Sequence, residues 1–140
     1  MKKEAVISKE VALDDLEKFI NNFSKKEVER NTLSELYPDV LDGIMEGFVT
    51  FDESTLIPTL KLKEPLKDDQ GNTVISEVNF KTRIKPSDKA NIAKGLTIQT
   101  DILTYQLRMT AHIVGQPVSF LDKLSSYDYD IVSQISTVFS

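Results

Sequence analysis

The sequence predicts an α+β fold: N-terminal helices, then a β-hairpin or small antiparallel sheet, then a C-terminal helical bundle. Three observations lead to this prediction. Apolar residues recur at three- and four-residue steps before residue 47, alternate with polar residues between positions 56 and 81, and return to helical spacing after position 86. Helices grouped on either side of a run of strands are typical of the α+β class.

The first helix is expected to open at Asp14, which can cap it while Glu17, three residues later, reaches back to the cap. Its apolar face consists of residues at helical spacing: Leu13, Leu16, Phe19, Ile20 and Phe23. The same spacing of a capping residue and a Glu recurs at Ser24, where the chain can bend and begin a new turn, and the capping pattern is repeated from Thr32 to Glu35.

A second helix is predicted over residues 38–46. Pro38 fits its first turn, where a missing N–H costs nothing, and Gly47 is a suitable stop. The side chains expected to face inward are Val40, Leu41, Ile44 and Met45.

Two strands follow, over residues 56–63 and 74–81, and both show alternation of apolar and polar residues. The Gly71-Asn72 pair between them predicts a hairpin. Pro58 cannot donate to a strand ladder, so the first strand is expected to lie at a sheet edge or to start irregularly.

Three helical segments complete the chain. A short helix is opened by Pro86 and closed by Gly95, and a longer one covers residues 98–114 with two adjacent apolar stripes, which indicates burial on two sides. The last helix is expected to be capped by Ser126. Its apolar residues again recur at helical spacing: Ile131, Val132, Ile135, Val138 and Phe139.

Composition excludes several classes of protein. A chain of 140 residues fits one domain with a substantial core, and the absence of Cys removes disulfides and thiolate metal sites and favours an intracellular setting. The first ten residues contain no apolar run of signal-peptide length, and no segment approaches the length of a membrane span, so a soluble protein is expected. A net charge of -5 argues against nucleic acid as a partner.

Charge is unevenly distributed along the chain. Residues 1–55 hold 7 Lys and Arg against 13 Asp and Glu, residues 56–95 hold 8 against 5, and residues 96–140 hold only 2 against 4. Low charge is typical of interface cores, but it is equally typical of the core of a domain. Residues 1–55 are thus the most acidic part of the chain.

No catalytic or metal-binding pattern stands out. His112 is the only histidine, and a zinc site around it would need three carboxylate or water ligands, which suit zinc poorly. Residues 68–72 resemble the start of a calcium loop, but the closing Glu at the twelfth position is missing, so a turn is the better interpretation. We expect no enzyme activity, no cofactor and no metal.

The cluster Tyr127-Asp128-Tyr129-Asp130 permits two interpretations. Ser126 or Asp128 can simply cap the last helix, with the acids favoured at its positive end. Alternatively, the two tyrosines can anchor a partner, since Tyr buries a large area at a low cost in entropy.

The second part of the chain resembles a known family. The run LIPTLKLKEPLKDDQGNTVISEVNFKTRIKPSDKANIAKG precedes a long helix, TDILTYQLRMTAHIVG, and then come QPVSFLDKL, a Tyr/Asp cluster and the ending ISTVFS. This order is similar to that of tail assembly chaperones from Mu-like and related contractile-tailed phages. Leu124, Asp128 and Phe139 match the spaced Leu, Asp and terminal Phe of that family. The resemblance covers residues 56–140, which are expected to form a hairpin plus helices. Residues 1–55 lie outside it and are interpreted as an acidic helical N-terminal extension, with both parts in one compact domain.

The resemblance implies a non-catalytic assembly factor of the host cytoplasm that binds the tape measure protein, the tail tube protein or both. Homo-oligomers are also expected, and nucleic acid and membranes are not. Seven residues are the candidates for partner binding: Tyr105, Tyr127, Tyr129, Ile131, Ile135, Val138 and Phe139. One alternative is a structural component of a phage tail or baseplate that stays in the virion. Another is a regulator with a helix-turn-helix in residues 86–114, although that segment offers only Arg108 after Gly95.

Overall fold

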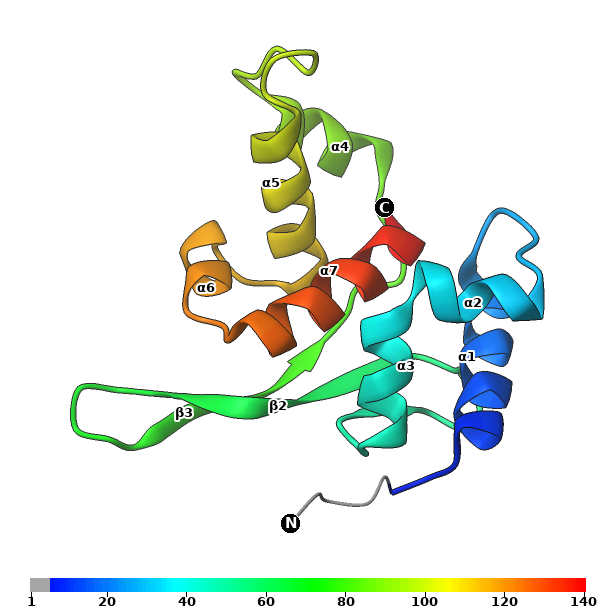
Figure 1. The fold of residues 1–140 in the computed structure, drawn as a ribbon. Helices are drawn as coiled ribbons and strands as arrows, with labels where there is room; N and C mark the ends of the chain where they lie inside the picture. Colours follow the sequence, from blue (N-terminus) through cyan, green and yellow to red (C-terminus); the bar gives the residue numbers. More distant parts are fainter. Residues whose placement is uncertain (1–5) are drawn as a thin grey trace.

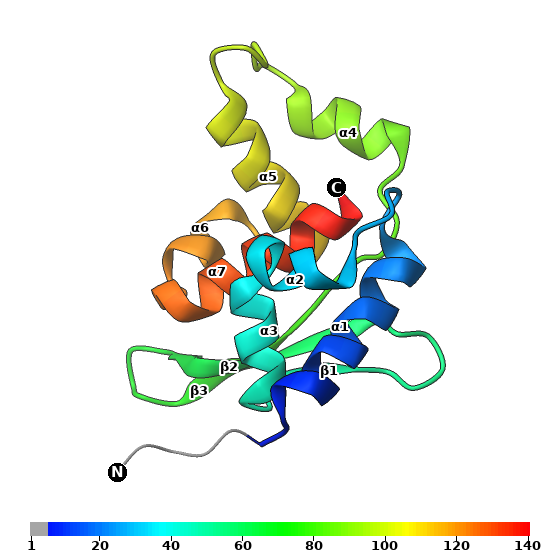
Figure 2. The ribbon, with the colours of Figure 1, turned by 45° about the vertical axis from the view of Figure 1, so that its right-hand side comes forward.

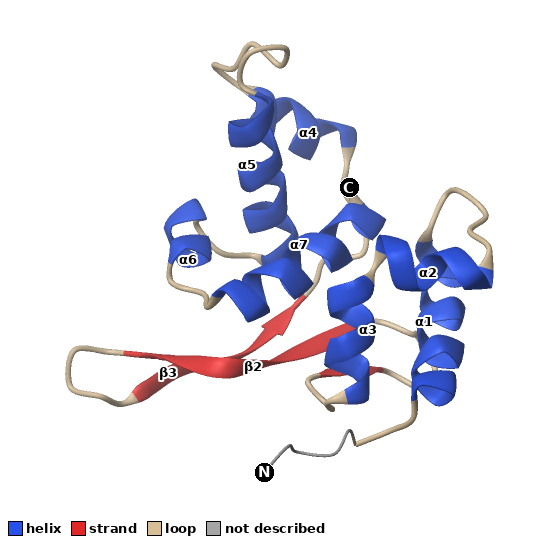
Figure 3. Ribbon diagram, in the orientation of Figure 1, coloured by secondary structure: helices blue, strands red, loops and turns tan. Residues whose placement is uncertain are grey.

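The computed structural model describes residues 6–140, which form seven helices and a three-stranded antiparallel sheet. Figures 1 and 3 show how the helices and strands are arranged. This arrangement confirms the predicted α+β class, with helices at both ends of the chain. The helices are α1 (Lys9–Phe23), α2 (Arg30–Leu36), α3 (Pro38–Met45), α4 (Pro86–Ala93), α5 (Ile102–Val114), α6 (Val118–Asp122) and α7 (Ser126–Phe139). The strands are β1 (Val49–Phe51), β2 (Pro58–Lys67) and β3 (Thr73–Asn79).

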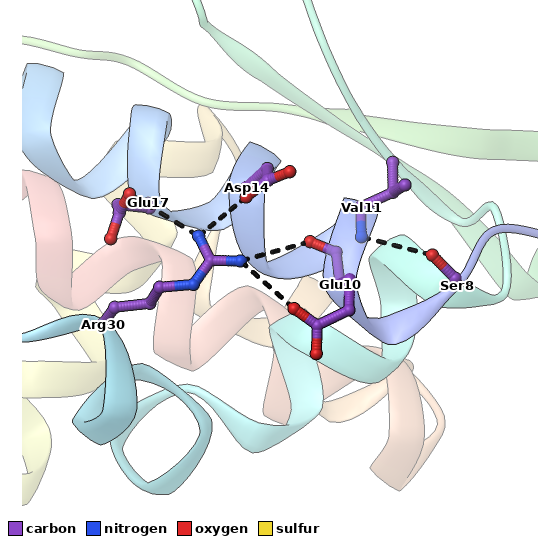
Figure 4. A network of polar contacts seen from close by, with 6 residues as sticks. All are labelled: Ser8, Glu10, Val11, Asp14, Glu17 and Arg30. Atoms are coloured by element: carbon purple, nitrogen blue, oxygen red, sulfur yellow. Dashed lines mark hydrogen bonds and ion pairs between the residues drawn. The ribbon is translucent and has the colours of Figure 1, made fainter.

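Helix α1 begins earlier than its sequence predicts. Ser8 caps it, with its Oγ accepting a hydrogen bond from the Val11 N–H at 3.3 Å. The expected cap, Asp14, instead lies within the helix and contacts the Arg30 guanidinium at 2.7 Å. Figure 4 shows that the same guanidinium also reaches Glu10 and Glu17, so one Arg at the start of α2 binds three carboxylates along α1. Because these groups are partly exposed, we expect only a modest contribution to stability.

The two other expected capping sites are wrong as helix starts. Ser24 ends α1, and its Oγ accepts from the Lys26 N–H at 3.3 Å, which forms a turn rather than a new helix. Thr32 lies inside α2 and donates back to the Glu29 carbonyl. Helix α3 agrees with its prediction: Pro38 occupies its first turn, and Gly47 follows it with φ of +83°.

Strand β2 lies in the centre of the sheet, between β1 and β3. Of the two alternatives for this strand, the sheet edge is therefore wrong; Pro58 is accommodated because it is the first residue of β2, opposite Phe51. Strand β1 was not predicted, since three residues are too few to show alternation.

The hairpin of β2 and β3 contains a shift in register. Lys61 pairs with Glu77, but the next pair toward the turn is Leu66 with Ile75, so β2 carries extra residues between these points. Beyond the bulge Val74 is exposed, although it lies in the same alternating set as the buried Val78. In Figures 1 and 2 this outer part of the hairpin projects away from the helices.

The C-terminal helices differ from the prediction mainly at their starts. Helix α4 has the expected bounds, whereas α5 begins at Ile102, four residues later than expected. Gly115 closes α5 with φ of +68°. The cap of α7 is Ser125 rather than Ser126, and its Oγ accepts from the Asp128 N–H at 3.1 Å.

Helix α7 crosses the middle of the molecule, with α1–α3 on one side and α4–α6 on the other (Figures 1 and 2). Its terminal Phe139 packs edge-on against Phe23, with centroids 5.1 Å apart, and against Phe19 at 5.7 Å. A single buried cluster runs from Ala12 to Phe139. Residues 9–51 therefore share the core of the C-terminal part instead of forming a detachable extension.

Candidate functional site

Asp128 is a fully buried carboxylate at the start of α7. It accepts hydrogen bonds from the backbone N–H groups of Lys63 and Glu64, at 2.9 and 3.1 Å, and from the Ser125 hydroxyl at 3.0 Å. These N–H groups belong to the part of β2 that the register shift leaves without its regular partners on β3. Asp128 thus joins α7 to the sheet, a structural role that its acidic neighbours in the sequence do not indicate.

Tyr127, one of the expected partner anchors, is engaged within the fold. Its hydroxyl donates to the Asp42 carboxylate at 2.7 Å, and its ring lies 4.6 Å from the Lys63 ammonium and edge-on to Phe48. Partial burial, together with the hydrogen bond to Asp42, raises the pKa of Tyr127 well above its usual range. This side chain fixes α7 against α3.

The apolar face of α7 is sealed inside the protein, which corrects the sequence prediction for four residues. Ile131 and Ile135 have no exposed surface, and Val138 and Phe139 are 8% and 7% exposed. Helix α7 packs against α1, α3 and α5 of the same chain, and this packing explains the helical spacing of the four residues. They are not accessible to a partner in this fold.

Gln134 is a second α7 side chain with a structural role that the sequence did not reveal. Its amide oxygen accepts from the N–H groups of Asp39 and Val40, each at 3.1 Å, and its amide nitrogen donates to the Asp39 carboxylate. These two N–H groups lie in the first turn of α3, where Tyr37 supplies no side-chain cap. Gln134 therefore caps α3 from another helix.

Two of the predicted anchors, Tyr105 and Tyr129, are brought together by the fold. Both are half-buried, and both line a groove of about 600 Å³ between α5 and α7. Its α5 wall carries mostly apolar side chains, among them Ile102, Leu103 and Met109, while the α7 wall carries the small hydroxyl side chains of Ser133, Ser136, Thr137 and Ser140. Among the residues that the structure describes, Lys89 of α4 is the one charged side chain that lines it.

The first turn of α5 presents apolar side chains to solvent. Leu103 is 73% exposed, Ile102 is 43% exposed, and Ile98, just before the helix, is 42% exposed. The two predicted stripes of this helix are buried only toward its C-terminal end, at Met109, Ile113 and Val114. Low charge in the last third of the sequence thus has two causes: a buried α7, and an exposed apolar ridge that borders the groove.

The residues considered for chemistry are held in structural contacts. His112 Nε2 lies 3.4 Å from the Asp88 carboxylate, which links α5 to α4. The Lys85 N–H donates to that carboxylate and lowers the pKa of Asp88, with a smaller contribution from His112. Within residues 6–140 no group of three His, Cys, Asp or Glu side chains is placed to hold a metal ion. Asp68 binds the N–H groups of Gln70 and Asn72, as a turn requires.

No protein-family model matches the chain, and no curated protein or solved structure shows significant similarity to it. The resemblance to tail assembly chaperones therefore remains a prediction. Across residues 6–140, none of the helices combines the length and the apolar character needed to cross a membrane.

Proposed function

We propose that the protein is a non-catalytic tail assembly chaperone that acts in the host cytoplasm and binds the tape measure protein, the tail tube protein or both. The observation that carries this proposal is the groove between α5 and α7 with its exposed apolar ridge. An apolar groove beside a ridge of exposed Leu and Ile suits the face of an amphipathic segment from another protein. The order of elements over residues 56–140, on which the family resemblance is based, adds to this support.

The binding surface proposed here differs from the one that the sequence suggested. It comprises Ile102, Leu103 and Tyr105 on α5 and Tyr129 on α7, and leaves out the four apolar residues that α7 buries. Tyr105 and Tyr129 present large rings at low cost in entropy, which is typical of residues that dominate binding energy. Leu103, as the most exposed of the apolar lining residues, is the best site for a disruptive substitution.

Co-expression with a tagged tape measure protein, and separately with a tagged tail tube protein, from the same phage, followed by pull-down, tests the proposal. We expect the wild-type chain to be retained and Leu103→Glu to be lost, because the substitution places a charge on a surface that must lose its water. Leu36→Glu is the matched control: Leu36 is 55% exposed on α2, away from the groove, and this variant should bind as wild type does. Absence of wild-type binding to both tail proteins would contradict the proposal.

Mass spectrometry of purified particles separates this function from that of a structural tail or baseplate component. A chaperone leaves once the tube has polymerised, so we expect the protein to be absent from mature virions. Presence at a stoichiometric level would favour the structural alternative.

A further inference from the structure

The groove between α5 and α7 ends next to a cluster of positive charge. Lys89 lines the groove and also lines a smaller neighbouring hollow of about 170 Å³, which includes Lys25 and Arg83. All three side chains are exposed, and no Asp or Glu side chain of residues 6–140 lines either hollow. In the part of the chain that the structure describes, none of the three forms an ion pair. The cluster is notable in a chain whose net charge is -5.

The α7 wall of the groove is a stripe of small hydroxyl side chains. Ser133, Ser136, Thr137 and Ser140 are spaced as neighbours on one face of the helix. Small side chains let a neighbouring helix approach closely, but a stripe of this kind alone does not make a site.

Ser136 supplies an independent sign of a missing partner. It is only 2% exposed, it lines the groove, and its buried Oγ has no hydrogen-bond partner within residues 6–140. Buried hydroxyl groups nearly always find a partner, since an unpaired one loses the hydrogen bonds that water would supply. Because the Oγ is covered in the free protein, a ligand in the groove has to shift the neighbouring side chains to place a polar group against it.

We propose that this groove binds one amphipathic helix of about three turns from another protein, with acidic residues at the end of the helix that meets Lys89, Lys25 and Arg83. The α7 wall extends from Tyr129 to Ser140, or about 16 Å at 1.5 Å per residue, which sets the length. The partner's apolar side chains lie against Ile102 and Leu103, and a polar group reaches the Ser136 hydroxyl. This inference deepens the proposed function and rests on it.

Two other occupants fit the observations less well. A second copy packed symmetrically on the groove would bring the same lining from both sides, and with it two lysines at position 89 and no acid to pair with them. A small anionic amphiphile would fill the hollow but leave uncovered the ridge that continues to Leu103 and Ile98. A helix lying along the groove covers both the hollow and the ridge.

The test uses the full chain and two synthetic peptides that differ only in charge. Each is a helical peptide of about four turns with leucines at helical spacing. One ends in three glutamates and the other in three lysines at the same positions. Titrations followed by amide chemical shifts give affinities and map the surface. We expect the acidic peptide to bind about tenfold more tightly than the basic one, with the largest shifts around Tyr105, Tyr129 and Ser136.

Charge-reversal variants make the test specific. Lys89→Glu should weaken the acidic peptide by about threefold to tenfold and improve the basic one, since each exposed ion pair is worth about 0.2–1 kcal/mol and reversal adds repulsion. Lys94→Glu makes the same change of charge just after α4, outside the lining, and should alter neither affinity. Leu103→Glu should weaken both peptides by about tenfold or more.

Several results would overturn the inference. These are binding of the acidic peptide weaker than about 1 mM, equal affinity for the two peptides, or identical effects of Lys89→Glu and Lys94→Glu. A wild-type dimer in light scattering that Leu103→Glu dissociates would assign the groove to a second copy. Tighter binding of laurate than of the acidic peptide, with the same shift map, would assign it to an amphiphile. Failure of the tape measure and tail tube pull-downs alongside the expected peptide results would refute the proposed function alone.

Discussion

Replacing Asp128 with alanine removes the carboxylate that joins α7 to the bulged part of β2. Three donors lose their acceptor: the N–H groups of Lys63 and Glu64 and the hydroxyl of Ser125. The three hydrogen bonds are partly buried, so each donor left without its acceptor costs up to about 1–3 kcal/mol, and removing a fully buried carboxylate returns part of that cost. We therefore expect Asp128→Ala to lower the free energy of unfolding by about 2–4 kcal/mol.

Urea unfolding followed by circular dichroism measures this change. With an m-value of about 2 kcal/mol per M, the midpoint should fall by about 1–2 M while the slope stays constant. Asp128→Asn should lie between alanine and wild type, because it keeps one acceptor oxygen but turns an amide NH2 group toward a donor. Asp130→Ala is the control, since Asp130 is exposed two residues along the same helix and should change stability by about 0.5 kcal/mol or less.

Amide hydrogen exchange supplies the result that would refute this reasoning. The N–H groups of Lys63 and Glu64 should be protected in the wild type and exchange faster in Asp128→Ala. If Asp128→Ala unfolds within 0.5 kcal/mol of wild type and leaves the exchange of both amides unchanged, the carboxylate does not hold the bulge.

Three further predictions concern the fold. Ile135→Asp should abolish the folded state, because Ile135 has no exposed surface and a buried, unpaired carboxylate costs several kcal/mol; a native far-ultraviolet spectrum with cooperative melting would contradict this. Gln134→Ala should destabilise the protein by about 1–2 kcal/mol through loss of the cap on α3, whereas Thr137→Ala on the same helix should cost less than half as much in the same melts. The carboxyl carbon of Asp52 should titrate in NMR with a midpoint of about 2, since the N–H groups of Thr55 and Ser54 and the Ser54 hydroxyl bind its charged form. Because this pKa is depressed in the folded state, its contribution to stability is complete above the usual Asp range and is lost as pH falls toward 2; a midpoint near 4 would contradict the turn geometry.

The sequence revealed those elements whose signals are local. Pro38 and Gly47 bracket α3, and the alternation around Leu60 with the turn at Gly71 defines the hairpin. The start of α1 was predicted too late in the sequence. Asp14 has the chemistry of a helix cap, but in the fold it forms a tertiary contact with Arg30 instead.

The features that were missed depend on distant pairs. Asp128 binds backbone groups 64 and 65 residues away, and Gln134 binds groups 94 and 95 residues away, so no window of sequence contains both partners. The helical spacing of Ile131 and Ile135 showed an apolar face correctly but could not show what covers it. Tyr105 and Tyr129 were selected individually, and only the packing of α5 against α7 places them in one groove.

The central claim is that the partner occupies the groove between α5 and α7. Site-specific photo-crosslinking during co-expression with the tape measure protein tests this claim most directly. A crosslinking amino acid at position 103 should join the two proteins, and the same amino acid at position 36, exposed on α2, should not. Crosslinks of equal yield from both positions, or from position 36 alone, would contradict the account.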